Sequence, residues 1–198
     1  MASAATYAKM IETAQRVSDN LQRESDRGCV ILAFAWMDEQ LSSNLQRFLL
    51  PSSHQSSRSD ELLGAGRPLG DAATKIDLSF RLGLLRENTK TSLHLFRRLR
   101  NDFAHLSSHL TFETPSVRDR VLAIFDSEEL LLNAVWNART DASLQPPVTQ
   151  GSEKAVHQMR QQWGTKGLFA FTAGILVSAL VLIGDTLTPV ISPGGDRQ

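Results

Sequence analysis

Apolar residues recur at helical spacing in most of this 198-residue chain. The spacing predicts helices over residues 3–22, 26–50, 71–86 and 89–105, with one or two more between 116 and 138. The alternation of apolar and polar residues that indicates a half-buried strand does not extend over a useful length. The pattern therefore predicts an all-α protein, a compact bundle of about five to six helices.

The last apolar run carries no charge over 18 residues, from 167 to 184. As a helix it would span about 27 Å, enough for a thin bilayer core. Lys166 precedes the run and Asp185 follows it, so the positive-inside rule places the main domain in the cytoplasm. The alternative is a buried C-terminal helix that closes the core, but the preceding linker favours a single transmembrane helix.

These patterns predict three parts in the chain. Residues 1–140 form a helical domain, and residues 141–153, rich in Pro, Gln and Ser, form a linker. Residues 154–198 supply a juxtamembrane helix, the membrane-spanning segment and a short tail. Gly174 and Ser178 lie four residues apart in that segment, a spacing that supports helix pairing in lipid. We expect a single-pass protein of the cytoplasmic membrane.

The helix predicted over 89–105 has two chemically different faces. Its apolar residues fall within about 100° of arc and should be buried; they are Leu95, Phe96, Leu99, Phe103 and Leu106. The opposite face carries His94, Arg98, Asn101 and His105, with Arg97 beside them. Such a face is either a solvated surface or a functional one. In the functional case, His94, Arg97 and Arg98 are candidates for contacting a protein partner.

A second functional interpretation is catalytic. Imidazole can transfer protons near neutral pH and guanidinium can hold a phosphate, so the two together could cleave RNA without a metal. His105 would then act as general base or acid, Arg100 as the phosphate clamp, and Asn101 would orient one of them. A regular helix points Arg100 and His105 about 140° apart. A joint site therefore needs a distorted helix end or a second copy of the chain.

The composition narrows the function further. The chain has 21 basic and 21 acidic residues, so no overall field draws it to nucleic acid. The single cysteine, Cys29, excludes an intrachain disulfide and a cysteine-rich zinc site. The histidines lack the spacing of a metal site, so neither a metal nor another cofactor is predicted.

Three blocks of the sequence resemble the mannitol-operon-repressor (MltR-like) family. Residues 100–105 read Arg-Asn-Asp-Phe-Ala-His, similar to the family's Arg-Asn-x-Phe-Ala-His. Residues 24–29 read Glu-Ser-Asp-Arg-Gly-Cys, and a third block runs from Leu62 to Leu78. The resemblance covers about residues 20–125. It implies an all-helical domain associated with transcriptional regulation that lacks a DNA-reading element of its own.

A more distant resemblance concerns Arg100 and His105 alone. An Arg followed by His five positions later is similar to the signature of HEPN domains, many of which are metal-independent ribonucleases that act as dimers. Our first hypothesis is therefore an MltR-like regulatory domain, tethered to the membrane, that binds a protein partner and forms a homodimer. The alternative is a HEPN-type ribonuclease with a role in stress or defence, for which RNA is the substrate.

Overall fold

The computed structural model describes residues 4–51, 60–105, 109–129 and 163–191, together with residues 131, 132, 135, 159 and 161. Within these residues it contains α1 (Ala4–Arg23), α2 (Asp26–Phe48), α3 (Ala72–Arg81), α4 (Glu87–Ala104), α5 (Pro115–Ser127) and α8 (Thr165–Thr186). The described part of the chain has no strand. The all-α prediction is confirmed, while the predicted linker over 141–153 lies outside the described residues.

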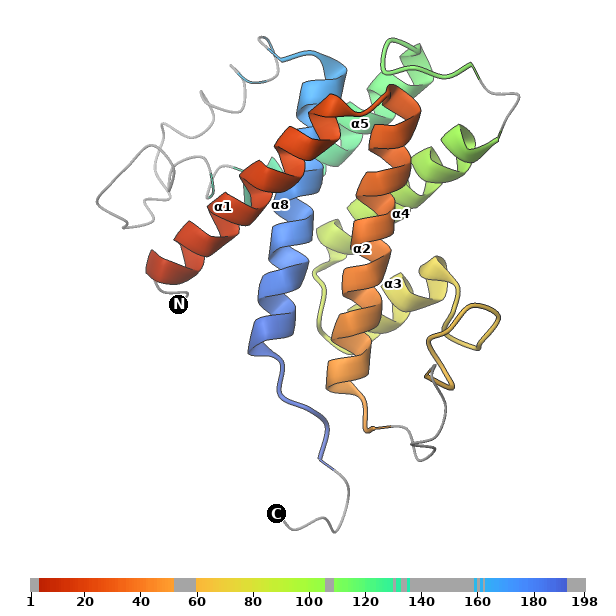
Figure 1. The fold of residues 1–198 in the computed structure, drawn as a ribbon, viewed down its shortest axis with the longest axis vertical. Coiled ribbons are helices and arrows are strands. Elements are labelled where there is room, and N and C mark those ends of the chain that lie inside the picture. Colours follow the sequence, from red (N-terminus) through yellow and green to blue (C-terminus); the bar gives the residue numbers. More distant parts are fainter. Residues whose placement is uncertain are drawn as a thin grey trace.

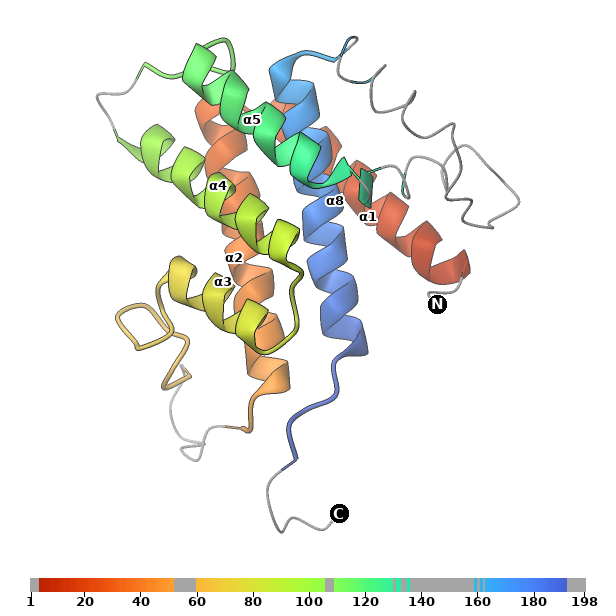
Figure 2. The ribbon, with the colours of Figure 1, turned by 180° about the vertical axis from the view of Figure 1, so that it is seen from behind.

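Helix α8 lies in the middle of the bundle. Figure 1 shows α2 and α8 running side by side in the same direction, with α1 running the opposite way across α8. Seen from behind in Figure 2, α3, α4 and α5 cover the far side of α2 and α8. Helix α8 packs against α1, α2 and α5, and α4 packs against α2, α3 and α5. The core is therefore built around the C-terminal helix.

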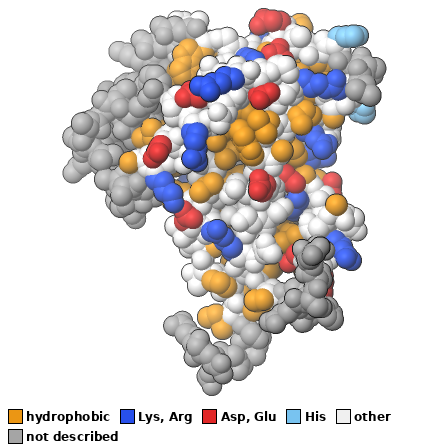
Figure 3. All heavy atoms as spheres, in the orientation of Figure 1, with side chains coloured by type: hydrophobic (Ala, Val, Ile, Leu, Met, Phe, Trp, Pro, Cys, Tyr) orange, Lys and Arg blue, Asp and Glu red, His pale blue; other side chains and the backbone are white. Residues whose placement is uncertain are grey.

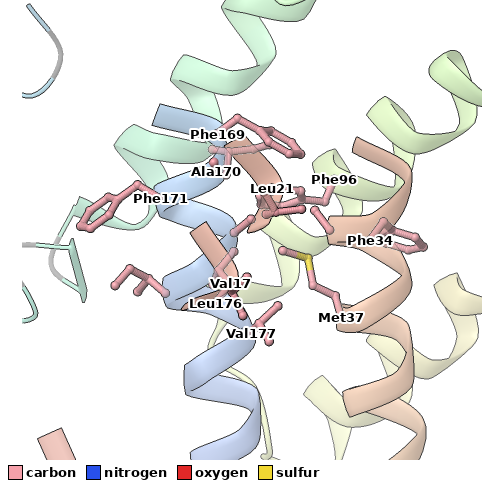
Figure 4. Close-up of a cluster of buried hydrophobic side chains, with 14 of the residues drawn as sticks. Val17, Leu21, Phe34, Met37, Phe96, Phe169, Ala170, Phe171, Leu176 and Val177 are labelled. Atoms are coloured by element: carbon pink, nitrogen blue, oxygen red, sulfur yellow. The ribbon is translucent and has the colours of Figure 1, made fainter. Parts of the chain in front are cut away.

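Helix α8 has apolar residues on all sides, which fits either a membrane span or the centre of a core. It is long and apolar enough to cross a membrane, yet 72% of its most apolar window is buried within this structure. Figure 4 shows how α8 contributes Phe169, Ala170 and Leu176 to the cluster that also receives Leu21 from α1 and Met37 from α2. In this structure the apolar surface of α8 is covered by the protein itself.

The small residues of α8 allow α1 to approach closely. A Cβ atom added at Gly174 would lie 2.4 Å from the backbone oxygen of Ala14, a distance that atoms do not tolerate. Ser178, the other member of the predicted small-residue face, is buried and donates to the carbonyl of Ile175. Gly174 therefore packs against α1 of the same chain in this structure.

Polar contacts hold both ends of α8. Asn44 of α2 donates to the carbonyl of Leu180 at 2.9 Å, and Arg47 donates to the carbonyl of Gly184 at 3.1 Å. Asp185 forms an ion pair with Lys9 of α1 at 2.9 Å. At the other end, Lys166 pairs with Asp26 at 3.5 Å. The bond from Arg47 satisfies the carbonyl of Gly184, which lies in the last turn of α8, where carbonyls lack partners within the helix.

The helix boundaries follow recognisable signals. Ser25 caps α2, its hydroxyl accepting from the backbone N–H of Gly28 at 3.1 Å. Asp71 caps α3 in the same way. The third predicted helix continued to residue 86, but α3 ends at Arg81 because Gly83 adopts a φ of +76°, which breaks the helix.

The contact between α1 and α8 predicts opposite effects for two glycine substitutions. Gly174→Ala should lower the free energy of unfolding by about 1–3 kcal/mol, because the new methyl group forces the two backbones apart. Gly167→Ala meets only Trp163 Cβ at 3.6 Å and should be neutral or stabilising by up to about 1 kcal/mol. Urea unfolding followed by circular dichroism measures both, and equal effects would contradict this packing.

Candidate functional site

Helix α4 is fixed by its apolar face and exposes arginines on the other. Of the predicted stripe, Phe96, Leu99 and Phe103 are buried, Leu95 is partly buried and Leu106 lies outside the described residues. Leu93, which was not predicted, is buried with them. Arg98 and Arg100 are exposed, whereas Arg97 and Asn101 are partly buried.

A groove runs between α2 and α4 and is bounded by the start of α3. Its volume is about 440 Å³. The residues that line it are Ile31, Phe34, Ala35, Asp38, Glu39, Gly70, Asp71, Ala72, Arg97, Arg100 and Asn101. Three of the predicted site residues, Arg97, Arg100 and Asn101, thus meet in one place. We call this feature the α2–α4 groove.

Two of the carboxylates that line the α2–α4 groove form contacts with other parts of the chain. Asp38 pairs with Lys75 of α3 at 2.6 Å, and Lys75 also donates to Ser42 at 3.0 Å. Lys75 is 3% exposed and the Asp38 side chain is 34% exposed, so this ion pair joins α2 to α3 with its ammonium group buried. Asp71 accepts hydrogen bonds from the backbone N–H groups of Ala73 and Thr74 at the start of α3.

The two arginines of the groove differ in their contacts. Arg100 Nη1 donates to Asn101 Oδ1 at 3.1 Å. Arg97 has its Nε atom buried, with no hydrogen-bond partner in the described part of the chain. Buried polar atoms of native proteins are nearly always hydrogen-bonded, so an unpaired guanidinium nitrogen marks a place where a ligand or water is expected.

His105 is placed differently from Arg100. It is exposed and caps the C-terminus of α4, where the carbonyls of Ala104 and His105 accept from Arg27 Nη2 at 2.9 and 2.8 Å. His105 is not among the residues that line the α2–α4 groove. Of the three predicted catalytic residues, Arg100 and Asn101 therefore line the α2–α4 groove of one chain, and His105 does not.

The block over residues 24–29 joins separate parts of the fold. Asp26 accepts from the backbone N–H of Phe112 at 3.1 Å, in the loop before α5, and also pairs with Lys166 of α8. Arg27 caps α4. Cys29 is buried, and burial raises the pKa of its thiol to about 12, so it stays protonated and unreactive. The contacts of Asp26, Arg27 and Cys29 in this block therefore join and cap helices.

The motif over residues 100–105 is divided between the groove and the core. Arg100 and Asn101 line the groove, while Asp102 pairs with Arg120 of α5. Phe103 is buried, with its ring centroid 6.1 Å from that of Phe112. The pattern thus combines two groove residues with residues that lock the end of α4 in place.

His94 faces α3. Its Nε2 atom lies 3.1 Å from Asp77 Oδ1, and Lys90 lies 3.6 Å from the same oxygen. The hydrogen bond with His94 is the main reason that the pKa of Asp77 is lowered, with Lys90 adding to it. His94 was predicted to contact a partner together with Arg97 and Arg98. Within the chain its contact is Asp77, and a role of His94 in binding a partner stays a prediction.

One buried carboxyl group was missed by sequence reasoning. Glu128 follows α5, is fully buried, and accepts from Asn88 Nδ2 at 3.3 Å. Burial raises the pKa of Glu128, because the charged form loses its hydration. Nothing in the local sequence separates Glu128 from the exposed Glu129 beside it. Among the described residues, no group of three or more His, Cys, Asp or Glu side chains is placed to hold a metal ion.

Comparison with known proteins identifies the fold. The sequence matches no protein-family model and no curated protein. The structure is similar to a chain in the X-ray structure of the MtlR–HPr complex from Escherichia coli, with a TM-score of 0.54 and 20% sequence identity. The fold is MtlR-like. The similarity covers 85% of this chain and 98% of that chain, so it continues past residue 140, the end of the predicted helical domain.

The contact between His94 and Asp77 predicts a change in titration. In His94→Ala, the pKa of Asp77 should rise toward its ordinary value of 3.8, because its main hydrogen bond is lost. Because the pKa of Asp77 is lower in the folded state than in the unfolded state, the ionised carboxyl stabilises the fold when the pH is above the pKa of the unfolded state. This contribution is lost as the pH falls through the pKa of the folded state. Titration of the Asp77 carboxyl carbon by NMR measures the shift, with Arg98→Ala as the control. An unchanged pKa in His94→Ala would refute the assignment.

Proposed function

We propose that this MtlR-like chain is a regulatory protein-interaction domain that binds a protein partner on the exposed face of α4. Arg98 and Arg100 are exposed there, while the other side of the helix is packed in the core. Arg27 and Arg120 hold the C-terminal end of the helix. A rigid helix that displays guanidinium groups suits recognition of carboxylates on a partner surface.

The candidate partner is an HPr protein. The similar chain of Escherichia coli was solved as an MtlR–HPr complex, which supports a protein partner for this fold. The charges on the face seen in Figure 3 are interspersed in sign, which does not favour a nucleic-acid surface. We therefore propose that any regulation of transcription acts through protein binding, without a DNA contact of this chain's own.

Reversal of one charge on α4 tests this proposal. Arg98→Glu should weaken binding of HPr about tenfold, which corresponds to about 1.4 kcal/mol, because it places like charges across the contact. Isothermal titration calorimetry with purified HPr measures the affinity. The matched control is Arg16→Glu, which reverses the charge of an exposed arginine on α1.

Two results would count against the proposal. If HPr binds both variants as tightly as the original chain, the partner docks away from α4. If HPr does not bind the original chain, the partner is a different protein.

The position of α8 is a separate question for function. We propose that α8 acts as the central core helix, supported by the side-chain bonds that Asn44 and Arg47 make to its backbone. The membrane-spanning alternative rests on its length and apolar composition. In a membrane-spanning α8, Gly174 would no longer contact Ala14, so the paired glycine substitutions described above distinguish the two placements.

The ribonuclease alternative needs a second copy of the chain. Arg100 and His105 are both exposed, so a homodimer could bring them to one phosphate. Within one chain, Arg100 lines the α2–α4 groove and His105 does not. We rank binding above catalysis, because His105 is tied to the fold through its backbone.

An RNA cleavage assay separates these two functions. On the binding hypothesis, the full chain and its His105→Ala variant should be equally inactive on structured and single-stranded RNA in the presence of EDTA. Metal-independent cleavage that falls at least a hundredfold in His105→Ala would establish the ribonuclease instead, since general acid–base catalysis contributes about 10²–10⁴-fold.

A further inference from the structure

We propose that the α2–α4 groove binds a small organic anion, whose carboxylate or phosphate group is held by Arg97 and Arg100. This site adjoins the proposed partner surface and shares Arg100 with it, but its volume of about 440 Å³ suits a small molecule and is too small for a protein surface.

The first argument is the state of Arg97. This side chain is partly buried in the wall of the groove, and its Nε atom is buried without a hydrogen-bond partner in the described residues. A guanidinium group uses Nε and Nη together to hold a carboxylate or phosphate through two parallel bonds. Because this Nε has almost no exposed surface, Arg97 must turn toward the groove to complete such a clamp, and its Nε gains a partner when it does. Arg100, on the same wall, supplies a second guanidinium group.

The second argument is the balance of charge in the groove. Three carboxylates line it, but two are engaged by the fold: Asp38 with Lys75, and Asp71 with the first N–H groups of α3. Glu39, the third lining carboxylate, is exposed and makes no such contact among the described residues. The arginine side of the groove is therefore electropositive. Glu39 suits a hydroxyl or ammonium group elsewhere on the same ligand.

The third argument is that the walls are preformed. Phe34 is buried behind the groove, and the Asp38–Lys75 pair ties α2 to α3. The loop that reaches the groove at Gly70 is folded tightly on itself, since a Cβ atom at Gly70 would lie 2.3 Å from the carbonyl oxygen of Gly64. A site built on two helices and a closed loop loses little entropy when a ligand binds.

Thermal unfolding of the full chain tests this inference with two defined probes. Sodium phosphate and sodium succinate are compared with sodium chloride at equal ionic strength. Either probe should raise the Tm above that in chloride, because a ligand that binds only the folded state stabilises it. The phosphate and succinate results show which anionic group the site prefers.

Variants of neighbouring arginines locate the effect. The apparent affinity for the anion, derived from the rise in Tm, should fall at least tenfold in Arg97→Gln and in Arg100→Gln. It should persist in Arg98→Gln, which changes an exposed residue of the same helix outside the groove. Because Arg100 is exposed, Arg100→Gln tests the site even if Arg97→Gln does not fold.

Two outcomes would overturn the inference. One is a Tm that neither phosphate nor succinate raises above the chloride control. The other is a rise that is the same in the original chain and in both groove variants. Loss of HPr binding in Arg97→Gln without any response to free anions would also overturn it, because the groove would then receive an acidic side chain of the partner.

Discussion

The close approach of α1 and α8 at Gly174 and Ala14 is the contact on which the rest of the structure depends. It lets the most apolar helix of the chain lie against α1 while α2 and α5 cover its other sides. Burying such a surface is the main favourable term in folding, and a glycine at the crossing permits it. The N-terminal and C-terminal parts of the chain therefore share one hydrophobic cluster, which also includes residues of α2, α4 and α5.

The polar contacts around this core set the position of the candidate site. The first turn of α2 holds α8 through Asp26 and the end of α4 through Arg27. Helix α4 is thereby fixed at its C-terminus as well as along its apolar face. The same turn carries a block that resembles the MltR-like family, and in this structure its residues cap helices and join segments. A block that resembles a family motif can thus position a candidate site without being part of that site.

Two surfaces follow from the fixed position of α4. Its outer side presents Arg98 to solvent, which suits a partner protein, and the side toward α2 places Arg97 in a groove with Arg100. The adjacent residues Arg97 and Arg98 point to different environments because neighbouring positions on a helix lie about 100° apart. One helix can therefore serve both a protein partner and a small ligand, and substitution of the two arginines separates the two roles.

The positions of the main helices and the two faces of α4 could be predicted from the sequence, because helical periodicity depends on neighbouring residues. The sequence could not decide the place of α8, since an uncharged apolar helix satisfies its backbone equally well in lipid and in a protein core. Nor could it foresee that Arg97 and Arg100 share a groove while His105 does not, or that Glu128 is buried. Those features depend on which residues far apart in the chain pack together, and only the tertiary structure decided them.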